Sequence, residues 1–193
     1  MAITNGYATL AEAKTALNVT DTVDDALIER AVESASRLVD QHTGRVFYGT
    51  DGAVRYFTAD DGMVVVDDLR AITALETDEN GDRIYERTWS ATDYDLEPYS
   101  GPPYTRITRA PLGVYTFPRI AKSVKVTGNW GYCATGSHDA AITQATLLIA
   151  ARLFKRKDAP FGVVGSAEVG FMRLPTSDQD VKQLLQRYVR LIF

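Results

Sequence analysis

The sequence has 193 residues, of which 45% are hydrophobic and 24% are charged, and its formal net charge at pH 7 is −4. This composition predicts a globular protein of one ordinary domain, or of one domain with a sizeable insertion, and it excludes disordered and fibrous classes. No hydrophobic run reaches the roughly 18–20 residues that a membrane-spanning helix needs, and the first residues lack the basic and apolar regions of a secretory signal. We therefore expect no membrane partner and a chain that stays in the cytoplasm where it is made.

Cysteine and histidine are scarce. Cys133 is the only cysteine, and His42 and His138 are the only histidines. No intrachain disulfide or thiolate zinc cluster can form, and most metal and acid–base chemistry lacks its usual side chains. Asp-rich pairs such as Asp60–Asp61 match no calcium-binding loop. The sequence therefore predicts no metal, no cofactor and no enzymatic activity.

Charge is distributed unevenly along the chain. Residues 1–118 carry 10 Lys and Arg against 20 Asp and Glu, whereas residues 119–193 carry 11 against 5. One region is thus acidic and the other basic, a pattern that is typical of surfaces that meet a partner or nucleic acid. Two differently solvated faces explain the same numbers.

Two helices are expected at the N-terminus. Thr9 followed by Glu12 forms the pattern of a capping box, and Asn18 is expected to end this short helix. A second, longer helix is predicted over residues 23–43, where hydrophobic residues recur at helical spacing, and Gly44 follows it where a terminating glycine belongs.

The middle of the chain is rich in β-formers and turn residues. Asn80–Gly81 is a strong turn signal, and the five prolines between residues 97 and 118 predict loop with short edge strands. Period-2 or β-branched runs predict strands over residues 53–58, 63–66, 70–77 and 121–127.

A helix over residues 139–157 is predicted to be the most hydrophobic of all, with Ser137 or Asp139 as its N-cap. A helix that is apolar on nearly all faces is buried, either in a core or between subunits. Residues expected at a contact between subunits are Ile142, Leu148, Ile149, Arg152 and Phe154.

Residues 158–176 are predicted to form a loop, with a hairpin around Gly165–Ser166, before a last helix. The chain ends on an apolar segment without a polar tail, which suggests a docking peptide, although a helix end folded back on the core explains it equally well. Residues expected to face a channel or partner are Phe161, Gly162, Gly165, Glu168 and Gly170. Residues expected to dock on a partner are Arg187, Tyr188, Arg190, Leu191, Ile192 and Phe193.

Together these elements predict an α+β protein. Two N-terminal helices, a long buried helix and a C-terminal helix would form a small helical bundle from residues 1–46 and 127–193. An antiparallel β-rich module would be inserted between them over residues 47–126.

The order of these features resembles the phage head–tail connector (adaptor) proteins, in a longer subfamily with an elaborated central β-domain. The stretches that carry the resemblance, in this order, are Tyr7–Lys14, Thr43–Phe47, Val126–Tyr132, Ala151–Gly162, Asp178–Val181 and Leu185–Tyr188. They cover about half of the chain.

The resemblance implies a structural subunit of the virion neck, assembled in the host cytoplasm. Such subunits form a ring, commonly of twelve copies, that docks on the portal protein, extends the channel for double-stranded DNA and receives a stopper or tail-completion protein. It also implies that the apolar C-terminus docks on the portal. Two alternatives from other classes are a DNA-binding or packaging accessory protein that uses the basic C-terminal third, and a small hydrolase, against which the scarcity of histidine argues.

Overall fold

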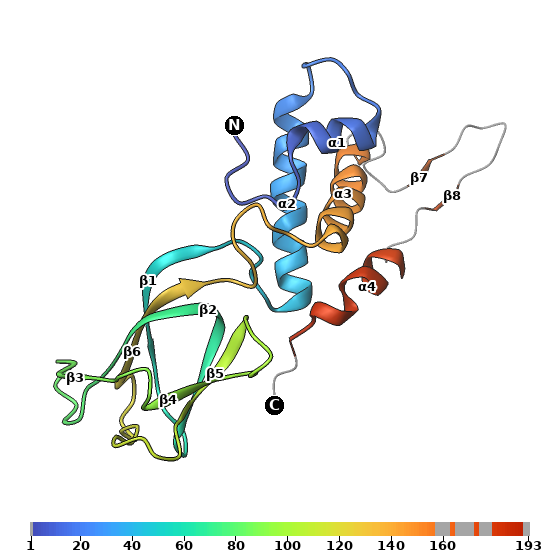
Figure 1. Cartoon of the computed structure of the whole chain (residues 1–193). Coiled ribbons are helices and arrows are strands. Elements are labelled where there is room, and N and C mark those ends of the chain that lie inside the picture. The colour runs from blue at the N-terminus through green and yellow to red at the C-terminus, as the bar shows by residue number, and fades with distance from the viewer. Residues whose placement is uncertain (1, 157–162, 165–171, 174–178, 191–193) are drawn as a thin grey trace. The chain divides into compact units, whose positions relative to one another are not determined.

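The computed structural model describes residues 2–156, 163–164, 172–173 and 179–190, and the chain divides into two compact units (Figure 1). The helical unit consists of Met1–Arg45 and Gly136–Phe193, and the β unit of Val46–Thr135. The predicted α+β class, with a helical bundle and an antiparallel β-module inserted in the sequence, is confirmed.

Among its described residues, the helical unit contains four α-helices and a pair of short antiparallel strands. The helices are α1 (Leu10–Leu17), α2 (Asp25–Thr43), α3 (Ala140–Lys155) and α4 (Gln179–Leu185), which continues into the 3₁₀ helix η1 (Gln186–Tyr188). Strands β7 (Val163–Val164) and β8 (Met172–Arg173) pair antiparallel on either side of the predicted turn. Within the described ranges, no helix is long and apolar enough to cross a membrane.

Local sequence signals set the ends of the first two helices. The Thr9 backbone N–H donates to Oε2 of Glu12 at 2.7 Å, and the Glu12 N–H donates to Oγ1 of Thr9 at 3.2 Å, so the predicted capping box is present. The bonds that the Thr9 N–H and the Thr9 hydroxyl donate to the Glu12 carboxylate lower the pKa of this carboxyl. Asn18 and Gly44 end α1 and α2 in the left-handed conformation, at φ 56° and 66°, as expected.

Small side chains let the helices of this unit approach closely. The buried residues at the contact of α1, α2 and α3 include Ala13, Ala31, Ala35 and Ala150, beside the larger Ile28 and Val32. Alanine has only a methyl group, so it leaves room for the neighbouring helix backbone. Half-buried leucines and Phe154 pack against the edges of this cluster.

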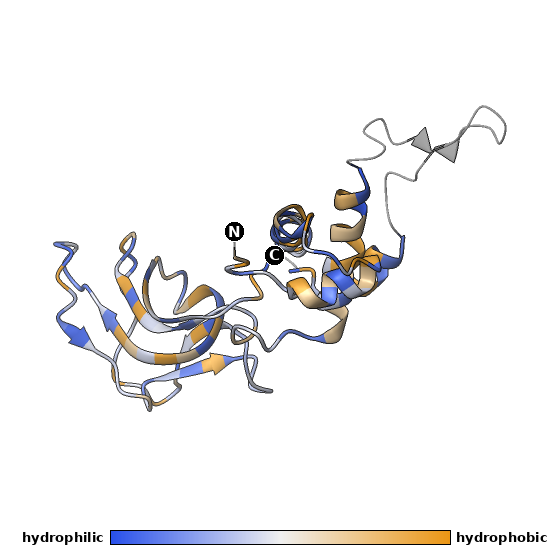
Figure 2. Cartoon of the chain, turned by 90° about the horizontal axis from the view of Figure 1, so that it is seen from above, coloured by the Kyte–Doolittle hydropathy of each residue, from blue (hydrophilic) through white to orange (hydrophobic). Residues whose placement is uncertain are grey.

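The β unit is an antiparallel sheet in the order β1–β6–β2–β5–β4, with β3 paired to β2. Apolar and polar residues alternate along its strands (Figure 2), as expected for a sheet with one buried face. The strands are β1 (Thr50–Phe57), β2 (Met63–Thr77), β3 (Arg87–Thr88), β4 (Tyr94–Glu97), β5 (Tyr104–Arg109) and β6 (Val124–Trp130).

Strand β2 differs from the sequence prediction. Residues 63–66 and 70–77 were expected to form two strands, but they belong to one strand of 15 residues. Its first half pairs with β5 and its second half with β6, and the register shifts between Val65 and Leu69 and again on either side of Ala71. These irregularities bend the strand, because an extra residue on one strand increases local twist. Similarly, β6 continues beyond the predicted residue 127 to Trp130.

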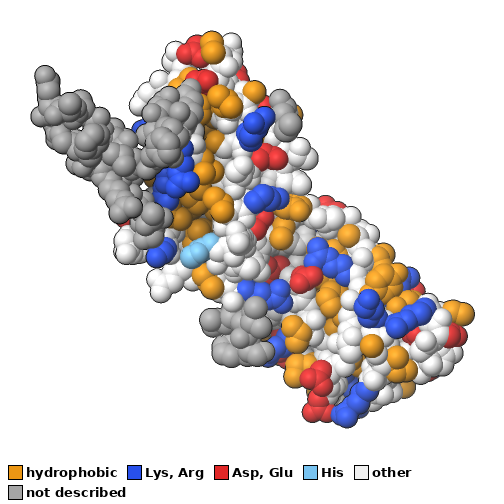
Figure 3. Space-filling view, turned by 180° about the vertical axis from the view of Figure 1, so that it is seen from behind, with side chains coloured by type: hydrophobic (Ala, Val, Ile, Leu, Met, Phe, Trp, Pro, Cys, Tyr) orange, Lys and Arg blue, Asp and Glu red, His pale blue; other side chains and the backbone are white. Residues whose placement is uncertain are grey.

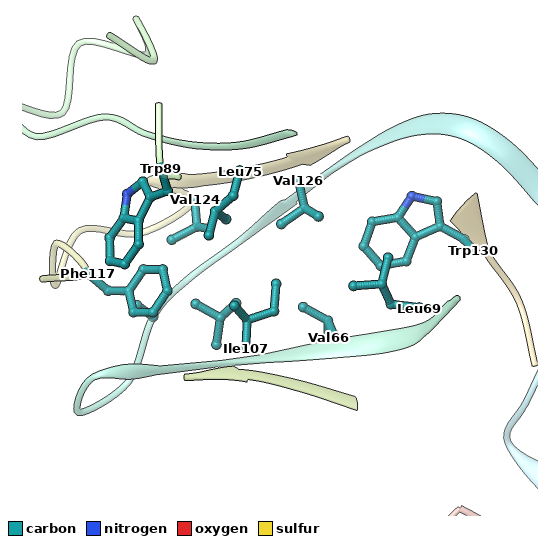
Figure 4. Packing of buried hydrophobic residues seen from close by; sticks show 11 residues of the cluster. Val66, Leu69, Leu75, Trp89, Ile107, Phe117, Val124, Val126 and Trp130 are labelled. Carbon is teal, nitrogen blue, oxygen red and sulfur yellow. The ribbon is translucent and has the colours of Figure 1, made fainter. Parts of the chain in front are cut away.

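Aromatic side chains fill the two ends of the β-unit core (Figure 4). Trp89 stacks on Phe117 with ring centroids 4.3 Å apart, and its indole N–H donates to the buried Thr77 hydroxyl at 3.0 Å. At the other end, the Trp130 indole N–H donates to the Ala53 carbonyl at 2.8 Å. Both buried indoles therefore satisfy their one polar atom, which avoids the cost of an unpaired donor.

Gly128 in the middle of β6 allows the close approach of β2. A Cβ atom at this position would lie 2.4 Å from the Ala71 carbonyl oxygen, closer than real Cβ atoms come. We expect Gly128→Ala to lower the free energy of unfolding by about 3 kcal/mol. The added methyl group would clash with the Ala71 backbone, which cannot rotate away as a flexible side chain can. Gly52→Ala on β1 is the control, since φ is +65° there but no atom lies within 4 Å, and it should cost about 1 kcal/mol. Equal losses in urea unfolding would contradict the steric explanation.

Candidate subunit and partner interfaces

The residues that the sequence predicted at a contact between subunits all lie on helix α3. Ile142 is fully buried within the single chain. Leu148, Ile149, Arg152 and Phe154 are only half-buried, which leaves them partly accessible at the surface of the helical unit. The apolar character of α3 thus divides between the core and the surface.

An apolar groove lies between the first half of α2 and the last turn of α3. Its volume is about 230 Å³, and its lining residues are Leu27, Arg30, Ala31, Ser34, Leu153 and Phe154. Figure 3 shows hydrophobic side chains gathered on the helical unit with Lys and Arg side chains at their edge. Small-molecule sites usually measure about 300–1,000 Å³, so this groove suits one or two side chains of a partner better than a cofactor.

The groove has an exposed cation in its lining, Arg30 on α2. Lys155 at the end of α3 and Arg156 directly after it are also exposed, and they follow the lining residue Phe154 in the sequence. Within the part of the chain that the structure describes, none of the three forms an ion pair. The cations near the C-terminus of α3 complement the negative end of its helix dipole, but they remain available to an acidic partner.

The C-terminal segment is held inside the helical unit by Tyr188. This side chain is buried, and its hydroxyl donates to Oδ2 of Asp139 at 2.5 Å. Its carbonyl accepts from Nε of Arg45 at 2.8 Å, and the Arg190 N–H donates to the Thr43 carbonyl at 2.8 Å. Tyr188 therefore anchors this segment within the helical unit.

The remaining docking candidates fall into two groups. Arg187 is exposed and pairs with Asp139 at 2.8 Å, and Arg190 is half-buried. The apolar end, Leu191, Ile192 and Phe193, lies outside the described residues. So do all the loop candidates, Phe161, Gly162, Gly165, Glu168 and Gly170.

Asp139 has a different role from the predicted one. It stands at the N-cap position of α3, but its side chain makes no capping hydrogen bond. The hydrogen bond from the Tyr188 hydroxyl, together with the Arg187 guanidinium, lowers the pKa of the Asp139 carboxyl. Burial and the neighbouring carboxylate raise the pKa of Tyr188 to about 12. The carboxylate thus joins the start of α3 to the end of the chain.

The β unit presents a well-ordered loop between β2 and β3. The buried carboxylate of Asp78 accepts backbone N–H bonds from Asn80, Gly81 and Arg83 at 2.7–3.2 Å. Asp78 also lies with Asp82 and Glu86 in a group whose carboxylate oxygens are within 4.8 Å of one another. The backbone bonds to Asp78 show its structural role, which is to fix the turn predicted at Asn80–Gly81.

The scarce nucleophilic and basic side chains have structural contacts. The Cys133 thiol donates to the Phe47 carbonyl at 2.9 Å. The His138 ring packs edge-on against Tyr7 with centroids 4.9 Å apart, and His42 is exposed on α2. Cys133 and His138 therefore make packing contacts, and His42 is a surface residue.

Taken together, the structure defines an α+β protein of two compact units. Residues 7–75, about a third of the chain, match the family model described as phage gp6-like head-tail connector protein. This range contains α1, α2, β1 and most of β2, so it crosses from the helical unit into the β unit. The resemblance to head–tail connector proteins is confirmed over these residues.

Solved structures with the same fold match the whole chain. One is a chain of the neck of an empty gene transfer agent particle computed with C6 symmetry, at 20% identity and a TM-score of 0.59, with 100% of this chain and 95% of that chain covered. Another is the neck of the native particle computed with C12 symmetry, at 19% identity and a TM-score of 0.59, with 100% and 94% covered. A third is a chain of the virion of the native gene transfer agent particle, at 17% identity and a TM-score of 0.59, with 100% of this chain and 95% of that chain covered. Curated proteins include no match.

The contact between Tyr188 and Asp139 can be tested by pH-dependent unfolding. Tyr188→Phe should lower the free energy of unfolding by about 1 kcal/mol at pH 7, because it removes a hydrogen bond to a carboxylate that is half exposed to water. The folded-state pKa of Asp139 is lowered, so its contribution is present above the unfolded-state pKa and is lost as the pH falls through the folded-state value. The difference between the two proteins should therefore shrink in acid.

Tyr99→Phe is the matched control for this experiment, since Tyr99 is exposed and should tolerate the change. A difference between wild type and Tyr188→Phe that stays constant from pH 7 to pH 2 would show that the Asp139 carboxylate is not the partner that matters.

Proposed function

We propose that this chain is a structural subunit of the head–tail connector in the neck of a tailed phage or a phage-like particle such as a gene transfer agent. The observation that carries the proposal is the connector-family match over residues 7–75, on a chain whose whole length has the fold of neck proteins. Its role is mechanical and adhesive, and it performs no chemistry.

In the assembled state we propose a closed ring of identical copies, of about twelve. The neck structures with this fold were computed with C6 and C12 symmetry, which supports a cyclic arrangement. Cyclic rings of more than two copies use head-to-tail contacts, in which two different surfaces of one subunit meet.

The proposed ring docks on the portal protein above and receives a stopper or tail-completion protein below, and double-stranded DNA passes through its centre. Tyr188 is committed to the helical unit, so docking on the portal falls to Arg187, Arg190 and the apolar residues 191–193 that follow. Passing DNA must slide, so its contacts with the ring are to phosphates and independent of sequence.

The first test is native mass determination of the purified chain, with negative-stain images of the same sample. We expect a closed ring of about twelve copies with a central hole wide enough for duplex DNA, or a ring that closes on addition of the portal protein. A chain that stays monomeric alone and also ignores the portal would contradict the connector role. Tight binding of that monomer to DNA fragments, weakened by salt, would favour the DNA-binding accessory role instead.

A further inference from the structure

The loop between β2 and β3 holds an exposed isoleucine in a fixed position. Ile84 is 64% exposed, and its backbone N–H donates to Oδ1 of Asp82 at 2.7 Å. The Tyr85 hydroxyl donates to the Lys122 carbonyl at 2.8 Å, and the Arg83 guanidinium donates to the Ala121 carbonyl at 2.6 Å. With the three bonds to Asp78, these contacts order the loop before any partner arrives, so little conformational entropy is lost on docking.

A group of carboxylates belongs to the same loop as this isoleucine. Asp82 and Glu86 are exposed, their carboxylate oxygens lie within 4.8 Å of each other, and neither forms an ion pair among the residues that the structure describes. The loop thus presents a hydrophobic side chain together with a group of negative charges. A surface that fits it must be a small apolar depression with cations at its edge.

The α2–α3 groove has these properties. It is lined mainly by apolar atoms of Leu27, Ala31, Leu153 and Phe154, and its size suits one or two side chains. Its lining includes the exposed cation Arg30, and the exposed Lys155 and Arg156 directly follow the lining residue Phe154 in the sequence. Groove and loop are therefore complementary in size, polarity and charge, and the same chain carries both.

We propose that the loop 78–86 of one copy docks into the α2–α3 groove of the next copy, with Ile84 in the groove and Asp82 and Glu86 against Arg30. The occupant is a second copy of this chain, because each copy offers one loop and one groove, as a head-to-tail contact requires. The proposal rests on the proposed ring and names the contact that closes it.

Cysteine cross-linking tests the contact directly. In a Cys133→Ser background, chains with Ile84→Cys and chains with Ser34→Cys are co-expressed and treated with a short bismaleimide. Ser34 is exposed and lines the groove. We expect cross-linked dimers that contain one chain of each kind, and a ladder of several copies when both cysteines are in one chain. Leu112→Cys, another exposed apolar position of the β unit, and Gln41→Cys, further along the same face of α2, should give neither product.

Charge reversal tests whether Arg30 of the groove pairs with the acidic loop. Arg30→Glu and Glu86→Arg should each raise the concentration at which half of the chains are assembled by about tenfold, because each places like charges together. The double variant Arg30→Glu/Glu86→Arg should return this concentration to within about threefold of wild type. If the half-assembly concentration of the double variant rises by the product of the two single-variant increases, the proposed charge pairing is overturned.

Two leucines of α2 provide a matched pair for the groove itself. Leu27 lines the groove and is 45% exposed, whereas Leu38 lies outside it and is 43% exposed. Leu27→Glu should raise the half-assembly concentration at least tenfold, and Leu38→Glu should leave it unchanged, while both unfold at similar urea concentrations.

The outcomes separate this inference from the proposed function. If the wild type forms rings but the cysteines at positions 84 and 34 do not cross-link, the proposed contact is overturned and the connector role stands. The same holds if Leu27→Glu still forms rings. Cross-linked monomers without dimers would place the contact within one chain and also overturn it. A wild type that forms no ring with or without the portal would overturn the connector role itself.

Discussion

Pairing between β1 and β6 is the constraint on which the two-unit design depends. These are the strands by which the chain enters and leaves the β unit, and they are joined from Thr50 opposite Trp130 to Phe57 opposite Val124. Beyond the strands, the Tyr132 N–H donates to the Val46 carbonyl at 2.8 Å. The insertion therefore begins and ends at one place, and the helical unit can be completed from two stretches of chain that are 90 residues apart in sequence.

This arrangement divides the work of the molecule between the two units. The helical unit is closed by small side chains and by the Asp139–Tyr188 contact, and it keeps the second face of α3 partly accessible. The β unit has its own aromatic core, and its loop between β2 and β3 is fixed by hydrogen bonds to Asp78. Each unit can therefore offer a preformed surface to a partner without loosening its interior.

The sequence predicted best what is decided locally. The caps at Thr9, Asn18 and Gly44 depend on residues within one turn, and all three were found from the sequence. The bend that makes β2 one strand depends on partners in β5 and β6, so its two halves read as separate strands. Asp139 was expected to cap α3 and Tyr188 to face a partner, because nothing in the sequence shows that residues 49 apart share a hydrogen bond. The groove and the loop at Ile84 likewise appear only once the chain is folded.

The use of Asp139 by the chain end has a consequence for synthesis on the ribosome. The β unit is complete in the nascent chain when residue 135 has emerged, so it can fold as a unit before α3 is made. The helical unit, by contrast, needs both of its stretches, because Asp139 receives its hydrogen bond from Tyr188 and the Thr43 carbonyl receives one from Arg190. During synthesis a finished β unit is therefore carried for a time on a helical unit that is still incomplete.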